Sequence, residues 1–134
     1  MKDPNTRFVL YAAAAVYTMF VPAALWLDAR PAAPPGSIVV RLGEFSHVEG
    51  FAFATRLQAL GAFEDDQSEA QRSPVILYED KKPLGPGRSR HYDVEYVGGG
   101  RYSHWKDLGI LFSASDNSNP KENNREYWAV LPKQ

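Results

Sequence analysis

Cysteine is absent from the 134 residues of this chain, and histidine is scarce, with three residues. The lack of cysteine excludes disulfide bonds, thiolate metal sites and a cysteine nucleophile. The formal net charge is −1 and the Lys and Arg residues are interleaved with acids, so the composition does not indicate a nucleic-acid partner. A chain of this length is expected to form one globular domain, with room for an appendage.

Charged residues are missing from residues 8–27, FVLYAAAAVYTMFVPAALWL, which Arg7 and Asp28 bracket. A helix of about 20 residues measures about 30 Å, which is the thickness of a bilayer core. A cleaved signal peptide usually has a shorter apolar region and small residues at its cleavage site, a pattern that residues 28–35 match poorly. Residues 8–27 therefore predict an uncleaved transmembrane helix.

The charges that flank this helix predict its orientation. Lys2 and Arg7 precede it against one acid, Asp3, whereas the two charges that follow it cancel. Because positive flanking charges favour the cytoplasmic side, we expect residues 1–7 in the cytoplasm and residues 37–134 on the opposite side of the membrane.

The predicted helix offers small residues and no ligands. It contains no His, Asp, Glu, Lys or Arg, so it has no axial ligand for a haem or chlorophyll and no ion path. Ala12 and Ala15, or Ala12 and Ala23, would let another helix approach closely, and Pro22 is expected to kink the helix. Trp26 stands where an aromatic side chain would meet the lipid headgroups. A plain tether with alanine as filler is the alternative.

In residues 37–134 apolar and polar residues alternate with a period of two, in short runs bounded by Gly, Pro and Asn. This pattern predicts an all-β fold, an antiparallel β-sandwich or jelly roll, after a Pro/Ala linker at residues 28–36. Residues 56–70 are expected to form a surface connection with at most two helical turns. The six predicted strands are residues 37–42, 50–57, 75–78, 92–97, 108–113 and 127–131.

A domain of this size can bury a core of its own. Only one of the two faces of each predicted strand is strongly apolar, which suits a sandwich whose sheets each expose one face to water. The predicted core residues are Phe45, Phe51, Phe53, Leu57, Val75, Leu77, Val94, Leu111, Phe112, Trp128 and Val130.

Residues 98–105, GGGRYSHW, combine a glycine triplet with two aromatic residues and a histidine. A nucleotide-binding loop needs a helix after it, and here a strand is expected, so the glycines predict a bend. Tyr102, His104 and Trp105 have three interpretations: a structural plug with His104 bonded to the backbone, a contact with a partner protein, or a contact with a glycan.

Asn117 and Asn119 belong to a polar run, residues 116–124, that is rich in oxygen ligands. The spacing does not fit an EF-hand calcium loop, because Lys121 and Tyr127 stand where Gly and Glu are required. Asn, Asp and Ser are also the residues of a long hairpin turn, which is the preferred interpretation. The two asparagines remain candidates for contact with a partner or a glycan.

No residue pattern indicates catalysis or a bound metal. His47, His91 and His104 lie on separate segments without the paired spacing of metal ligands. The chain has no GxSxG motif for a serine nucleophile. Its neighbouring carboxylates are typical of strand ends and of a solvated strand face, and they do not indicate a catalytic pair. We therefore expect a protein that is not an enzyme and that holds no cofactor or metal.

Three runs in this domain, ILYEDKKPLGP, GGGRYSHW and LFSASDNSNP, resemble a pattern in uncharacterised bacterial proteins, some of them linked to surface polysaccharide metabolism. The resemblance covers residues 73–128. It implies a recurring β module and includes no motif with a catalytic role.

Two functions fit these observations. The first is a non-catalytic accessory subunit of a larger complex in the bacterial inner membrane, of the respiratory or photosynthetic reaction centre–light-harvesting type. Its helix would pack on that integral membrane complex within the lipid bilayer, and its β domain would dock on the periplasmic face. The alternative is a membrane-anchored module that binds envelope glycan through Tyr102, His104, Trp105 and the asparagine-rich loop.

Overall fold

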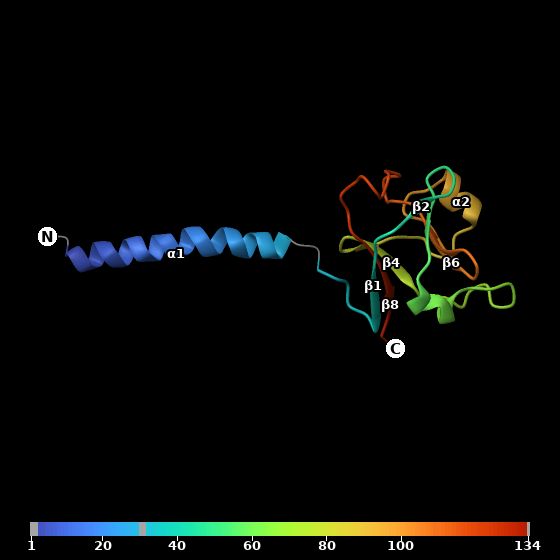
Figure 1. Ribbon diagram of the computed structural model, residues 1–134, viewed down its shortest axis with the longest axis horizontal. Helices are drawn as coiled ribbons and strands as arrows, with labels where there is room; N and C mark the ends of the chain where they lie inside the picture. Colours follow the sequence, from blue (N-terminus) through green and yellow to red (C-terminus); the bar gives the residue numbers. More distant parts are fainter. Residues whose placement is uncertain (1–2, 30–31, 134) are drawn as a thin grey trace. The chain divides into compact units, whose positions relative to one another are not determined.

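The computed structural model describes residues 3–29 and 32–133, which belong to two compact units, residues 1–31 and residues 32–134. The first unit contains one helix, α1 (Pro4–Ala29), and the second contains the β domain with one short α-helix (Figure 1).

Helix α1 runs over 26 residues and includes the whole of the predicted span, residues 8–27. It is long and apolar enough to cross a membrane, and none of its described residues is buried within the chain. The helix continues beyond Pro22, although proline has no N–H to donate to the carbonyl of Thr18 one turn earlier. The composition of α1 therefore leaves an apolar surface that nothing in its own unit covers.

The described part of the second unit, residues 32–133, contains eight strands in two four-stranded sheets, and every pair of neighbouring strands is antiparallel. An antiparallel β domain after an apolar helix was predicted, and this arrangement is confirmed. The first sheet has the order β1 (Ile38–Leu42), β8 (Tyr127–Leu131), β4 (Ile76–Glu79), β5 (Lys82–Pro83), and the second has the order β2 (Ser46–His47), β3 (Phe53–Thr55), β7 (Gly109–Phe112), β6 (Tyr102–Trp105).

Side chains from both sheets contribute to one hydrophobic core. The partly buried Phe45 ring packs against this core and meets Phe112 of β7 and Tyr127 of β8 edge-on, with centroids 5.3 and 5.7 Å apart. Two predicted core residues lie elsewhere: Phe51 is 38% exposed, and Trp128 is only half-buried. The remaining predicted core residues are buried or pack against a core cluster: Phe45, Phe53, Leu57, Val75, Leu77, Val94, Leu111, Phe112 and Val130.

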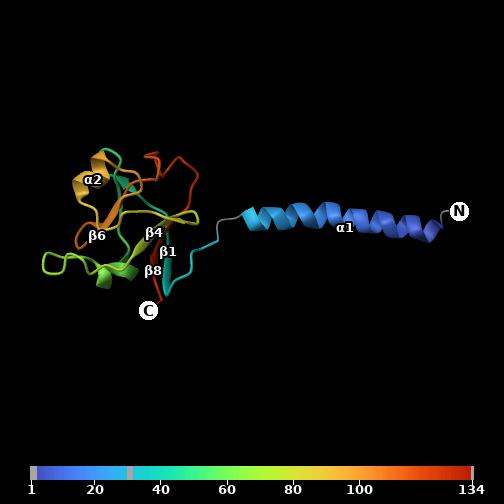
Figure 2. The same cartoon turned by 180° about the vertical axis from the view of Figure 1, so that it is seen from behind.

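The predicted strand at residues 92–97 is wrong, because this segment forms helix α2 (His91–Tyr96), which lies close to β6 in Figure 1 and Figure 2. Tyr92 and Tyr96 are one helical turn apart, their rings are tilted by 44° with centroids 4.8 Å apart, and both are exposed. Only Val94 is buried, so the alternation of apolar residues does not mark a strand face. Gly98, with φ of 66°, ends the helix as its N–H bonds to the carbonyl of Asp93.

Three strands were not predicted, and each is short or polar: β2 and β5 have two residues each, and β6 has the sequence YSHW. The connection that was expected to hold at most two helical turns contains a 3₁₀ helix, η1 (Gln58–Phe63). Its one buried residue, Leu60, anchors the connection to the core.

Replacing Gly98 with Ala is expected to lower the free energy of unfolding by about 2 kcal/mol, because a side chain strains the left-handed conformation. The new Cβ would also overlap the amide oxygen of Asn117. Gly43→Ala is the matched control, since nothing lies within 4 Å of a Cβ built at Gly43. Urea unfolding of the full chain in detergent, followed by tryptophan fluorescence, measures both variants. Equal midpoints would contradict this role for Gly98.

Candidate functional site

Helix α1 carries an apolar notch of about 420 Å³. Ala12 and Ala13 form its floor, because their side chains are the smallest on this face of the helix. Eleven residues, about three turns, separate Ala12 from Ala23, so Ala23 lies on the same side, whereas Ala15 lies further round. We call this feature the Ala12 notch; it is lined by Phe8, Val9, Ala12, Ala13, Val16 and Tyr17.

Trp26 lies in the last turn of α1 and is 59% exposed. The anchoring role of Trp26 stays a prediction.

Of the three aromatic and histidine candidates on β6, two are buried. Tyr102 is 7% exposed and donates its hydroxyl hydrogen to the carbonyl of Val75 at 3.1 Å, and His104 is 2% exposed. Both side chains are therefore largely enclosed, which favours the structural interpretation, and their contact role stays a prediction. Trp105 is half-buried, with its ring 6.3 Å from that of His91.

His104 belongs to a buried polar network that joins β6 to the connection before β4. Its Nδ1 lies 2.8 Å from the hydroxyl of Ser73. The plug interpretation expected a bond to the backbone, whereas this bond goes to a side chain. Asp65 is fully buried and accepts a bond from the Ser73 N–H at 2.6 Å. The backbone N–H of Asp65 also bonds to the carbonyl of His104 at 2.9 Å.

This network borders a cavity of about 270 Å³ that Arg88 and Tyr102 also line. The serine and histidine side chains are within hydrogen-bonding distance, but the nearest carboxylate oxygen at Nε2 of His104 belongs to Glu64 and is 3.8 Å away. That separation is too long for the bond that would orient a histidine as a general base. The geometry fits a structural link between β6 and the preceding connection better than it fits a nucleophile.

The asparagine-rich loop uses its oxygen atoms to hold its own turns and to bind the glycine turn at Gly99. Asn117 has φ of 62° and accepts a bond from the Gly99 N–H at 2.6 Å, and Asn119 accepts one from the Lys121 N–H at 3.0 Å. The Asp116 carboxylate accepts a bond from the Ser118 N–H at 3.1 Å. Within residues 3–29 and 32–133, no group of three or more His, Asp or Glu side chains is arranged to hold a metal ion.

An ion-pair cluster clamps the two ends of this loop. Arg125 contacts Glu79 through Nη1 and Asp116 through Nη2, the latter at 2.6 Å. Glu79 is 5% exposed and also accepts bonds from the Ser115 N–H at 3.0 Å and the Tyr127 hydroxyl at 3.3 Å. The guanidinium holds the pKa of Asp116 well below its usual range, while burial raises the pKa of Tyr127 to about 12.

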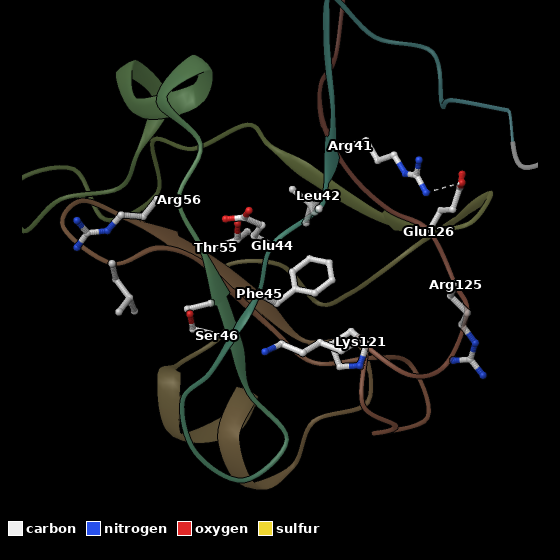
Figure 3. A pocket seen from close by; sticks show the side chains of 14 residues that line it. Arg41, Leu42, Glu44, Phe45, Ser46, Thr55, Arg56, Lys121, Arg125 and Glu126 are labelled. Atoms are coloured by element: carbon white, nitrogen blue, oxygen red, sulfur yellow. Dashed lines mark ion pairs between the residues drawn. The ribbon is translucent and has the colours of Figure 1, made fainter.

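A polar groove of about 1140 Å³ lies beside this clamp, between the β1–β2 connection, the end of β3 and the asparagine-rich loop (Figure 3). Two of its cations already have anionic partners: Arg41 pairs with Glu126 at 2.9 Å, and Arg125 belongs to the clamp. Glu44 and Lys121 also line the groove, and neither side chain has an ion pair within the described residues. The sequence did not reveal this groove, because its walls come from segments far apart in the chain.

No family model, no curated protein and no solved structure matches this chain. The likeness of residues 73–128 to a bacterial β module therefore stays an expectation.

Lowering the pH is expected to destabilise the domain through His104. Burial lowers the pKa of His104 below its ordinary value of 6.5 in the folded chain, so the unfolded chain gains this proton at a higher pH. Stability is therefore full above about pH 6.5 and is lost as the pH falls through the lowered pKa. Urea unfolding at about pH 7.5 and about pH 5 measures this decline. His104→Gln should flatten it and the exposed His47→Gln should not; the reverse would disprove the assignment.

Replacing Arg125 with Met is expected to cost about 3 kcal/mol of stability, because it leaves the buried Glu79 carboxylate without a cation. Arg41→Met removes an ion pair whose arginine side chain is 61% exposed, so it should cost less than about 1 kcal/mol. The difference between the two unfolding midpoints is the measurement. A similar small loss in both variants would mean that the clamp contributes no more than a surface pair.

Proposed function

We propose that the protein is anchored in the bacterial inner membrane by α1, with its N-terminus in the cytoplasm and residues 37–134 in the periplasm. The 26 residues of α1 measure about 39 Å, enough for the hydrocarbon core and part of the headgroup region. An apolar surface of this extent is not stable in water unless lipid or a partner covers it. The excess of positive charge before the span supports the orientation.

In this proposal the protein is a non-catalytic accessory subunit, and α1 packs against a helix of a larger membrane complex. The single observation that carries the proposal is the Ala12 notch, an apolar depression on a helix that has no packing partner in its own unit. Helices in lipid associate by close packing of their surfaces, and small residues let two backbones approach. Respiratory and photosynthetic complexes, which recruit small single-pass subunits, are the proposed class of host.

In this proposal the β domain is the passive periplasmic part of the subunit. Its two sheets pack as a sandwich of the jelly-roll type. A core shared by side chains of both sheets supports the sandwich assignment. A passive role is supported by the His104–Ser73 pair, which is enclosed and lacks a carboxylate at bonding distance from Nε2. The alternative of a glycan-binding module loses two of its expected contacts, because Tyr102 and His104 are buried.

Filling the notch should release the partner. The double variant Ala12→Ile, Ala13→Ile places branched side chains on the floor of the notch and should reduce the amount of co-purifying complex by about tenfold, equivalent to about 1.4 kcal/mol of helix packing. The measurement is affinity purification of the tagged full chain from native membranes in mild detergent, with partner stoichiometry determined by mass spectrometry.

Ala14→Ile is the matched control, because residue 14 lies on the opposite side of the helix. Each Ala→Ile change adds the same apolar surface. This variant should retain the partner at the stoichiometry of the unmodified chain. Purification of the unmodified chain alone, or retention of the partner by the notch variant, would contradict the proposal.

A further inference from the structure

The groove adjoins a smaller pocket of about 320 Å³, and Lys121 lines both. The two cavities also contain neighbouring residues of β2, Ser46 in the groove and His47 in the pocket. In Figure 3 the Lys121 side chain extends beneath the Phe45 ring toward the wall that carries Ser46. We call the combined surface the Lys121 cleft.

Two cations of the Lys121 cleft, Lys121 and Arg56, have no described carboxylate partner, whereas Arg125 has two, Glu79 and Asp116. Within the described residues, Lys121 has no ion pair, and the guanidinium of Arg56 donates to a neutral acceptor, the carbonyl of Asp107. Glu44 is the one lining carboxylate without a described cation partner, since Glu126 is paired with Arg41. Lys121 and Arg56 are therefore the two cations that a negatively charged ligand can contact without displacing a described ion pair.

The uncharged side chains of the cleft favour a ligand rich in hydroxyl groups. Ser46, Thr55 and Asn119 supply both donors and acceptors, which a hydroxyl group can use in either direction. Phe51 lines the smaller pocket with its ring 38% exposed, and such a ring can pack against the apolar face of a sugar. Few phosphates could be neutralised by two cations, so nucleic acid fits this surface less well.

We propose that the Lys121 cleft binds an acidic oligosaccharide. Lys121 and Arg56 contact its acidic groups, Phe51 packs on a sugar ring, and the neutral side chains bond to its hydroxyls. The proposal goes beyond the accessory role and is independent of the helix contact. It also places glycan recognition away from the buried side chains of β6.

Calorimetric titration of the full chain in phosphatidylcholine nanodiscs tests the proposal, with a hexamer of galacturonic acid as the probe. Maltohexaose, a neutral hexamer, and hexaglutamate, an acidic peptide, separate sugar recognition from charge. We expect the galacturonate hexamer to bind at least about tenfold more tightly than either. Lys121→Gln should weaken its binding by about tenfold, and Lys121→Arg should restore most of it because the charge is kept.

Lys81→Gln is the matched control, because Lys81 is exposed on the turn between β4 and β5 and does not line the cleft. This variant should bind as the unmodified chain does, and so should the Ala12→Ile, Ala13→Ile variant. Near-ultraviolet circular dichroism confirms that each variant is folded. Equal affinity for hexaglutamate, no binding of the galacturonate hexamer, or an unchanged affinity in Lys121→Gln would each overturn the proposal.

Discussion

An apolar helix surface that its own unit leaves uncovered is the constraint on which the functional account depends. No described residue of α1 is buried, and no charge interrupts it between residues 8 and 27. Water is a poor solvent for such a surface, and the helix is long and apolar enough to cross a membrane. The Ala12 notch is a side of the helix where small residues leave room for another backbone, and the proposed contact with a partner helix rests on it.

In the β domain a buried carboxylate fixes the asparagine-rich loop, which forms one wall of the Lys121 cleft. The buried Glu79 of β4 holds Arg125, and Arg125 holds Asp116. Lys121 lies between these two clamped ends, so the same ion pairs that stabilise the domain also set the position of the free cation. This coupling explains how a long polar loop keeps a defined conformation.

Those features that depend on local composition were predictable from the sequence, and those that depend on distant packing were not. The charge-free run predicted α1, and β-branched or aromatic runs predicted β1, β3, β4, β7 and β8. Alternation failed at α2, because the tilted contact between Tyr92 and Tyr96 allows both rings to face solvent while Val94 alone is buried. The cleft brings together Glu44, Lys121 and the end of β3, so no local pattern could have revealed it.

Membrane extraction combined with N-terminal sequencing tests the central claim most directly. If α1 is a permanent anchor, the mature protein in native membranes retains residues 8–27 and stays in the pellet after an alkaline carbonate wash. Mature protein that begins after Ala33 and is recovered from the soluble fraction would contradict the account, because it would show that the apolar segment is removed before the β domain acts.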